Sequence, residues 1–239
     1  MYADLKDKVV LITGAAGNLG SAVARYFHSA GSKLALVDQK KDHFQRTFGS
    51  EIPAEWLLCE ADITQKDSVT TVVAEAVNKF GRIDVLINIA GGYRGGSSVY
   101  ETGEDIWDFM MNLNARSVFL VSGAVAKVMI EKGNGGRIIS IGAKPGLEGT
   151  KNHTAYSASK AAVFRLTDSM AKELKPHGIN VNSVIPSTID TPQNREASPD
   201  ADFKKWVAPE SLAGVLAFLA SDASRDISGA HIPVYGGSM

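Results

Sequence analysis

The chain has 239 residues, of which 44% are hydrophobic and 21% charged, and its formal net charge is −1. These values are typical of a globular protein, and they exclude the basic character that favours binding to nucleic acid or anionic membranes. Its single cysteine cannot form an internal disulfide. The N-terminal residues lack the apolar core of a secretion signal, and no apolar run approaches the ~20 residues of a membrane span. We therefore expect a cytoplasmic protein that binds neither nucleic acid nor membrane.

Short runs rich in apolar and β-branched residues alternate with longer segments of helical spacing. Most of the short runs are apolar at every position, which predicts strands covered on both faces. The alternation predicts an α/β fold, a single Rossmann domain over residues 1–239 with a doubly wound, mostly parallel seven-stranded sheet. The expected strands are 9–12, 34–37, 56–59, 83–89, 137–141, 179–185 and 231–235, and the expected helices 18–30, 66–80, 104–132, 154–175 and 209–221.

A polar stretch containing Pro192 and Pro199 separates the last two predicted αβ units. We interpret residues 187–208 as a long loop over the sheet rather than as a linker between domains. Long loops in compact domains often cover functional sites. The sequence therefore predicts a substrate loop in this segment.

The first predicted strand runs into a glycine-rich turn, Thr13-Gly-Ala-Ala-Gly-Asn-Leu-Gly20, which is followed by a helix. Such a turn lets the backbone approach a pyrophosphate, and the helix N-terminus offers free N–H groups and a positive dipole. By itself the motif also fits an ordinary strand-to-helix turn. Because it opens a βαβ unit whose second strand ends in an acid, we favour nucleotide binding.

That acid is Asp38, 18 residues after Gly20. A carboxylate there can accept hydrogen bonds from both ribose hydroxyls and would repel the 2′-phosphate of NADP(H). We therefore favour NAD(H), while Lys40 and Lys41 leave NADP(H) open. Asp62, after the third strand, fits either a contact to the adenine amino group or an N-cap for the helix near Lys66.

Tyr156 and Lys160 lie near the start of a predicted helix, and their i,i+4 spacing puts the phenol and the ammonium on one face. A free phenol has a pKa of about 10, too high for acid–base work near neutrality. We expect the ammonium and a cationic nicotinamide to lower the pKa of the Tyr156 hydroxyl. The pair is common on helices, so its weight comes from the dinucleotide turn in the same domain.

Together these motifs resemble the short-chain dehydrogenase/reductase family, over nearly the whole chain from residue 8 to 237. The family's Asn-Asn-Ala-Gly motif matches residues 88–91 with one change. The resemblance implies an NAD(P)-dependent oxidoreductase with Asn114, Tyr156 and Lys160 as catalytic residues. The coenzyme contacts that it implies, together with those argued above, are at Gly14, Gly17, Asn18, Leu19, Gly20, Asp38, Asp62, Asn88, Ala90, Gly91, Tyr156, Lys160, Pro186, Ile189 and Thr191.

One departure from the family pattern concerns the serine that usually stands 13 residues before the tyrosine, where this chain has Ala143. Alanine has no donor to polarise a substrate carbonyl. Ser140 is nearby, but the sequence does not determine which face of the strand its side chain occupies. The segments 142–150, 190–195 and 199–203 resemble dihydropteridine reductases, which work without the serine, and Tyr93 stands where that branch carries tryptophan.

We therefore predict hydride transfer between the nicotinamide and a small organic substrate, such as a quinonoid dihydropterin. The alternatives are a carbonyl or secondary-alcohol oxidoreductase acting on a ketone or 3-oxoacyl compound, and a non-catalytic NAD-binding sensor. Tyr93, Ala143 and His153 are the candidate substrate residues. Tyr93 fits either stacking on a flat substrate or an exposed loop position.

Metal chemistry and self-association are the remaining questions. The histidines are scattered without ligand spacing, so we predict no metal site. The helices 104–132 and 154–175 carry apolar residues on more than one face. Because only one face can cover the sheet, and because family members pair through these helices, we expect a homodimer or homotetramer.

Overall fold

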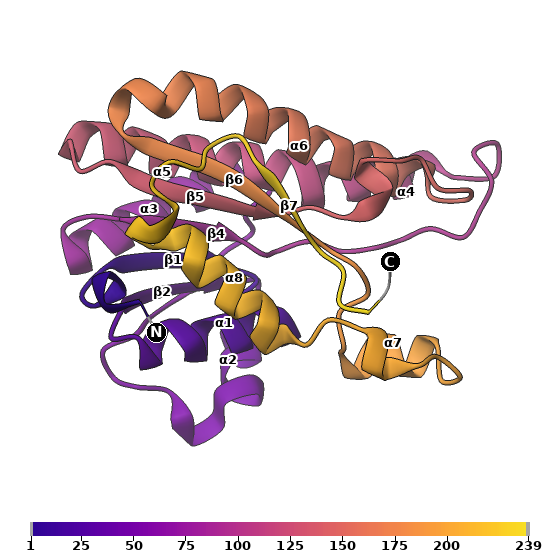
Figure 1. Ribbon diagram of the computed structural model, residues 1–239, viewed down its shortest axis with the longest axis horizontal. Coiled ribbons are helices and arrows are strands. Elements are labelled where there is room, and N and C mark those ends of the chain that lie inside the picture. The colour runs from indigo at the N-terminus through magenta and orange to yellow at the C-terminus, as the bar shows by residue number, and fades with distance from the viewer. Residues whose placement is uncertain (1, 238–239) are drawn as a thin grey trace.

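The computed structural model describes residues 2–237, in which seven parallel strands form one sheet in the order β3-β2-β1-β4-β5-β6-β7 (Figure 1). This arrangement confirms the predicted α/β fold, with every strand parallel. The register places Val10 beside Leu34 of β2 and beside Val85 of β4. The strands are β1 Val9–Thr13, β2 Lys33–Asp38, β3 Leu57–Glu60, β4 Val85–Asn88, β5 Gly136–Ile141, β6 Ile179–Pro186 and β7 His231–Val234.

The helices cover both faces of the sheet, with α1, α2 and α8 on one side and α3, α5 and α6 on the other (Figure 1). Ile139 of β5 packs with the first set and the adjacent Ile138 with the second. Because both faces are covered, neighbouring strand residues are equally apolar. The helices are α1 Asn18–Ser29, α2 Lys41–Phe48, α3 Lys66–Phe80, α4 Glu104–Met110, α5 Ser117–Lys132, α6 Thr154–Leu174, α7 Pro192–Ala197 and α8 Pro209–Ala220.

Two helices lie where the sequence predicted none. Helix α2 buries Phe44 and Phe48 in the core, although only these two of its residues are buried. Helix α7 lies inside the predicted loop 187–208 and begins at Pro192, with Thr191 as its N-cap. Short 3₁₀ turns occur at Ala3–Leu5, Gly49–Glu51, Lys144–Gly146, Lys175–His177, Phe203–Lys205 and Asp222–Ser224.

The predicted helix 104–132 forms one continuous helical run, but its middle has π geometry over Met111–Arg116. Between Glu104 and Lys132 this run is long and apolar enough to cross a membrane by length and composition. Half of its most apolar window is buried inside the protein, where Val121 and Val125 pack against the sheet. These contacts are those of a core helix.

The order of the strands changes direction between β1 and β4: β2 and β3 follow β1 toward one edge of the sheet, and β5, β6 and β7 follow β4 toward the other. Ligands of doubly wound folds bind at the carboxyl ends of the strands at such a switch point. Residues 13–20 follow β1 and residues 89–103 follow β4, so both segments begin at this point.

Candidate active site

A cleft of about 650 Å³ lies at the carboxyl ends of β1, β2 and β4. Its remaining walls include Phe109, Asn112 and Leu113 from the helical run above. Most of the residues that the sequence assigned to the coenzyme line this cleft, namely Gly14, Gly17, Asn18, Leu19, Gly20, Asp38, Asp62, Ala90 and Gly91.

The glycine-rich turn is closely packed beneath the cleft. A Cβ atom on Gly20 would lie 2.1 Å from the carbonyl oxygen of Gly14, so only glycine fits there. Helix α1 begins after Gly17, which has no side chain to cap its first N–H groups. This N-terminus can therefore receive the pyrophosphate of a dinucleotide.

Asp38, at the end of β2, lies beside this turn. Its Oδ2 accepts a 3.0 Å hydrogen bond from the Ala16 backbone N–H. Its Oδ1 lies 2.6 Å from Nδ1 of His43 on α2 and accepts from the Gln39 N–H. The carboxylate is thus held at the cleft wall, where it can accept hydrogen bonds from a ribose.

Asp62 does not cap α3, whose N-cap is Gln65. Its Oδ1 instead accepts hydrogen bonds from the backbone N–H and the hydroxyl of Thr64, at 3.0 and 2.6 Å. These bonds fix the loop after β3 with Asp62 on the cleft wall. The N-cap interpretation of Asp62 is therefore wrong.

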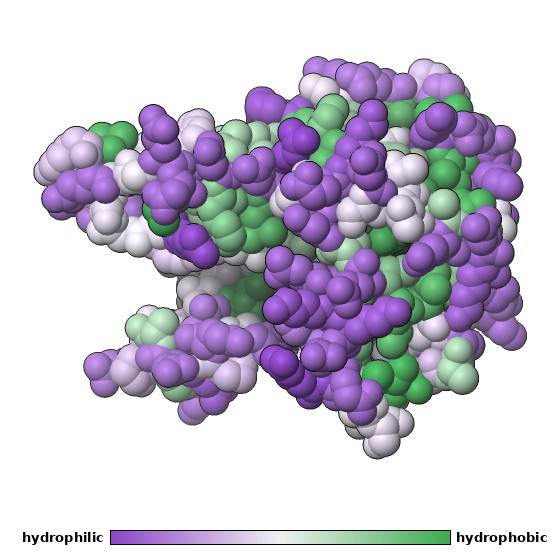
Figure 2. Space-filling view, turned by 180° about the vertical axis from the view of Figure 1, so that it is seen from behind, coloured by the Kyte–Doolittle hydropathy of each residue, from purple (hydrophilic) through white to green (hydrophobic). Residues whose placement is uncertain are grey.

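A second cleft, of about 700 Å³, continues from the first and shares Leu19, Ile89 and Gly91 with it. Figure 2 shows the surface hollowed between two projecting parts, with apolar residues at the back of the hollow. The second cleft brings together Tyr156 and Lys160 with Tyr93, Ala143, His153, Pro186 and Ile189. The chemical and coenzyme-binding candidates therefore lie in adjoining spaces.

Tyr156 and Lys160 lie one turn apart on α6, as predicted, but the effect on the phenol differs from expectation. Burial raises the pKa of the Tyr156 hydroxyl to about 12, and the nearby phenol of Tyr93 adds to the rise. Burial also lowers the pKa of Lys160 to about 8. Among the protein groups alone, burial therefore governs the pKa of the phenol, and its lowering beside a bound cationic nicotinamide stays a prediction.

Asn114 lies in the π segment and is buried. Its Nδ2 donates to the Ser159 hydroxyl at 3.0 Å and to the Gly92 carbonyl at 3.1 Å, and its Oδ1 accepts from the Gly92 N–H at 3.0 Å. A Cβ on Gly91 would lie 2.9 Å from Asn114 Oδ1 and 3.4 Å from Lys160 Nζ. The amide and the ammonium thus approach the same point of the cleft wall.

Three side chains predicted or considered for the cleft lie elsewhere. Asn88 is buried and donates to the hydroxyls of Ser122 and Ser140, so its amide joins β4 to α5 and β5. This use of Ser140 removes it as a substitute for the missing serine. Thr191 accepts from the Asn194 N–H as the N-cap of α7, and it is not among the residues that line either cleft.

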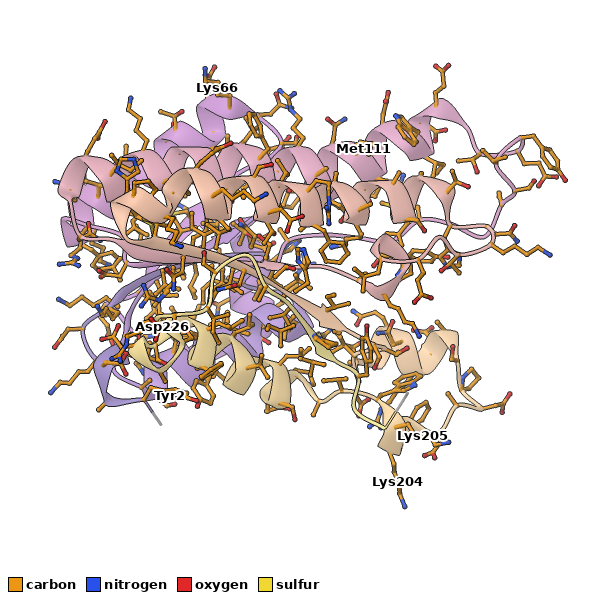
Figure 3. All side chains as sticks on the ribbon, turned by 45° about the horizontal axis from the view of Figure 1, so that its top comes forward. Tyr2, Lys66, Met111, Lys204, Lys205 and Asp226 are labelled. Carbon is orange, nitrogen blue, oxygen red and sulfur yellow. The ribbon has the colours of Figure 1, made fainter. Side chains whose placement is uncertain are left out.

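The segment that follows β6 has its two ends joined by backbone hydrogen bonds, and we call this junction of residues 188–190 with Val207 the neck. Val207 N–H donates to the Thr188 carbonyl at 2.9 Å, and Asp190 N–H donates to the Val207 carbonyl at 2.8 Å. Beyond the neck, α7 approaches the glycine-rich turn, where Asn18 Nδ2 donates to Gln193 Oε1. Figure 3 shows Lys204 and Lys205 at the outer end of this segment, on the opposite side of the molecule from Met111.

Sequence reasoning missed three contacts at these clefts. They are His43 against Asp38, Gln193 against Asn18, and Asn194, whose Nδ2 donates to the Ile189 carbonyl at 2.8 Å. The only available signal was that they are polar residues close to predicted site residues. Among residues 2–237, no group of three His, Cys, Asp or Glu side chains could hold a metal ion.

A hydroxyl–imidazole–carboxylate chain lies outside the clefts. His231 Nδ1 is 2.6 Å from the Ser183 hydroxyl, and its Nε2 is 3.0 Å from Asp168 Oδ1. Ser183 is fully buried and is not among the lining residues of either cleft. These three hydrogen-bonded side chains therefore connect β6, β7 and α6, and a substrate in either cleft cannot reach Ser183.

Comparison with known proteins decides the family. The model of the short chain dehydrogenase family matches residues 8–202, from β1 through the segment that follows α7. The chain belongs to the short-chain dehydrogenase/reductase family.

The relatives of this short-chain dehydrogenase/reductase match it along its whole length. It is 34% identical over 248 residues to an NAD-dependent glycerol dehydrogenase of Listeria innocua, with 98% of this chain and 94% of the relative covered. A 3-oxoacyl-[acyl-carrier-protein] reductase of Thermotoga maritima is 35% identical, with 98% of each chain covered. An NAD⁺-bound xylitol dehydrogenase structure matches with a TM-score of 0.88 at 28% identity, covering 98% of this chain and 99% of that chain. The chain is therefore an oxidoreductase of nicotinamide-dependent type.

Proposed function

We propose that this oxidoreductase interconverts a ketone and a secondary alcohol in a small polar substrate, with NAD(H) as its coenzyme. The observation that carries the proposal is the meeting of the two clefts, one ending at Asp38 and the other at Tyr156 and Lys160. The printed names of the relatives, among them dehydrogenases of glycerol and xylitol, support a polar alcohol.

The residues around the first cleft suit a dinucleotide. Asp38 would accept hydrogen bonds from the adenosine ribose, Asp62 would face the adenine, and the N-terminus of α1 would receive the pyrophosphate. Pro186 and Ile189, in the second cleft, would meet the nicotinamide end. A bound nicotinamide coenzyme supplies or accepts the hydride, and its oxidised ring adds a positive charge to the cleft.

NAD(H) is favoured over NADP(H) by charge at the ribose end. Asp38 and the neutral Gln39 line the cleft, whereas Lys40 and Lys41 are not among its lining residues. The Lys41 backbone N–H donates to the Glu60 carboxylate. A 2′-phosphate in this cleft would therefore lie beside the Asp38 carboxylate, which repels it, and not beside a lysine.

Tyr156 is the proton donor in reduction. As the carbonyl carbon gains a hydride, the oxygen gains the phenolic proton, and the C=O group becomes CH–OH. A pKa of about 12 keeps the phenol protonated at neutral pH, which suits a donor to the more basic alkoxide. Lys160 would return a proton to the phenolate through a water held by Asn114, since both side chains approach Gly91.

A quinonoid dihydropterin remains the second candidate, and the observation that favours it is Ala143. A quinonoid imine accepts hydride readily, so it needs less polarisation than a ketone. Tyr93, beside Tyr156, offers a flat face to such a ring. This candidate predicts activity with the dihydropterin that exceeds activity with every ketone.

The experiment tests a panel of substrates and measures turnover by the absorbance of NADH. Dihydroxyacetone, an acetoacetyl thioester, 1,2-cyclohexanedione and a quinonoid dihydropterin serve as oxidants, and glycerol and xylitol serve as reductants with NAD⁺. We expect turnover of at least one ketone, with kcat lower by roughly 100-fold or more in Tyr156→Phe. The control is Tyr100→Phe, an exposed phenol that should leave kcat unchanged. Coenzyme binding without turnover of any compound would instead support a sensor.

We also propose that two copies associate through α5 and α6. Phe119 on α5 is 60% exposed, an unusual position for a large apolar side chain. It lines a groove of about 690 Å³ together with Ala115, Ala162 and Leu166. A second copy related by a two-fold axis would cover this apolar surface.

A further inference from the structure

The second cleft lacks a hydroxyl group on the side of β5. Ala143 presents a methyl group there, and Ser140 is fully buried with its hydroxyl accepting from Asn88 Nδ2 at 3.2 Å. A ketone bound beside Tyr156 would therefore receive one hydrogen bond to its oxygen from Tyr156 but none from β5. Removing one such donor from an enzyme typically costs about 10²–10³ in rate.

A second phenol lies next to Tyr156. The rings of Tyr93 and Tyr156 have centroids 5.1 Å apart and meet at 86°, edge to face. The Tyr93 side chain is half exposed and lines the cleft that contains Ala143. Its hydroxyl is thus a donor within the cleft, carried by a loop rather than by β5.

The position of Tyr93 is fixed on two sides. Its ring stacks on His153 with centroids 5.1 Å apart, and its hydroxyl lies 2.9 Å from His153 Nε2. On the other side, a Cβ on Gly95 would lie only 2.7 Å from the Tyr93 hydroxyl oxygen. The half-exposed phenol thus contacts His153 on one side and lies against the Gly95 backbone on the other.

The hydrogen bonds of His153 decide what the Tyr93 hydroxyl can offer. His153 Nδ1 lies 2.7 Å from the Lys151 carbonyl oxygen, and because a carbonyl only accepts, Nδ1 carries a proton. In the neutral ring Nε2 accepts from Tyr93, whose oxygen can then accept from a substrate alcohol. In the protonated ring Nε2 donates to Tyr93, whose O–H is then free to donate to a substrate carbonyl.

We propose that Tyr93 supplies the hydrogen bond to the reacting substrate oxygen that Ala143 cannot, and that His153 is the positioning residue that sets its direction. The inference rests on the proposed carbonyl and alcohol function and names a further residue of that site. Protonated His153 favours reduction, and neutral His153 favours oxidation. The titratable and charged groups that face this pair are Tyr156 and Lys160 on α6, Lys144 after β5, and Arg94 and Glu101 in the loop after β4.

The experiment compares variants with the best ketone of the panel and NADH. Tyr93→Phe removes only the hydroxyl and keeps both ring contacts, so we expect kcat/KM to fall at least tenfold. Adding Ala143→Ser to that variant places a hydroxyl just after β5 and should restore kcat/KM to within threefold of the unaltered enzyme. A misfolded variant could not be rescued in this way, and Tyr100→Phe is the matched control.

The role of His153 has a separate readout. His153→Gln can still hydrogen bond to Tyr93 but cannot gain a proton, so we expect reduction to persist while its kcat/KM becomes less dependent on pH. Unchanged kcat/KM in Tyr93→Phe, failure of Ala143→Ser to rescue it, or an unchanged pH profile in His153→Gln would overturn the inference. Lack of activity in the unaltered enzyme with every ketone would instead overturn the proposed function.

Discussion

The ammonium of Lys160 donates a 2.9 Å hydrogen bond to the carbonyl oxygen of Ile141, in a site where burial lowers the lysine's pKa to about 8. An unfolded chain holds this proton up to a pKa of about 10.4. Between these values the unfolded state binds more protons than the folded state, so stability rises with pH. Below pH 8 both states are protonated, and the full cost of the buried cation applies.

Lys160→Met should therefore abolish this contribution to the pH dependence. The variant removes the buried cation, so its free energy of unfolding relative to the unaltered protein should fall by about 2–3 kcal/mol between pH 7 and pH 10. The lost bond to Ile141 adds an offset that does not vary with pH. Urea unfolding at several pH values measures the difference, and parallel stability curves would contradict a depressed lysine pKa.

Coenzyme choice should depend on the charge of Asp38. Asp38→Asn keeps the shape of the side chain and removes the charge that opposes a 2′-phosphate, so the Kd for NADPH relative to that for NADH should improve about tenfold, or ~1.4 kcal/mol. Fluorescence titration with both coenzymes gives the ratio. Glu60→Gln, which changes a carboxylate that is not among the cleft's lining residues, is the control. An unchanged ratio would mean that another group discriminates.

Asn114 should matter for both stability and turnover. Asn114→Ala removes the hydrogen bonds to the partly buried Gly92 backbone and to the buried Ser159 hydroxyl, which keeps its bond to the Tyr156 carbonyl, and should cost about 1–3 kcal/mol of unfolding free energy and lower kcat. Ser122→Ala removes one buried hydrogen bond to Asn88 in the same helical run and should cost about 1 kcal/mol with kcat unchanged. If both variants keep full kcat, Asn114 has only a structural role.

The exposed ring of Phe119 should control association. Phe119→Glu removes the large apolar side chain from a groove that Arg116 and Arg165 also line, so the protein should become monomeric at micromolar concentration while keeping its fold. Light scattering gives the mass, and circular dichroism the fold. Val99→Glu, which is 65% exposed and not among the groove's lining residues, should leave the mass unchanged. A monomeric unaltered protein would remove the basis for this interface.

Most of the fold followed from local sequence pattern. Residues such as Ile138 and Ile139 are apolar at consecutive positions because each faces a different helical layer. Helix α2 was not predicted, because its highly polar sequence places only Phe44 and Phe48 in the core and so shows little apolar periodicity. The π segment was not predicted because apolar spacing indicates a helix without distinguishing i→i+5 from i→i+4 hydrogen bonds over so few residues.

The site was predictable where a motif specifies backbone position and less so where it depends on long-range contacts. The turn at Gly14–Gly20 and the i,i+4 pair on α6 follow from neighbours in the chain. The bond between Tyr93 and His153 joins residues 60 positions apart, and two loops set its geometry. The rise in the pKa of Tyr156 that burial causes was not predictable, because spacing reveals the charged neighbour but not the depth of burial.

The hydrogen bonds that join residues 188–190 to Val207, next to α7, bear on the rate at which coenzyme can leave the site. Backbone hydrogen bonds secure the segment at Thr188, Lys205 and Val207, the one at Lys205 coming from the Gly237 N–H, whereas α7 contacts the glycine-rich turn through the side chain of Gln193. Movement of α7 away from the glycine-rich turn would therefore need the release of side-chain contacts such as the one at Gln193, and no hydrogen bond of the sheet. Coenzyme departure can then be fast in a protein whose global unfolding is slow, and the two rates can evolve separately.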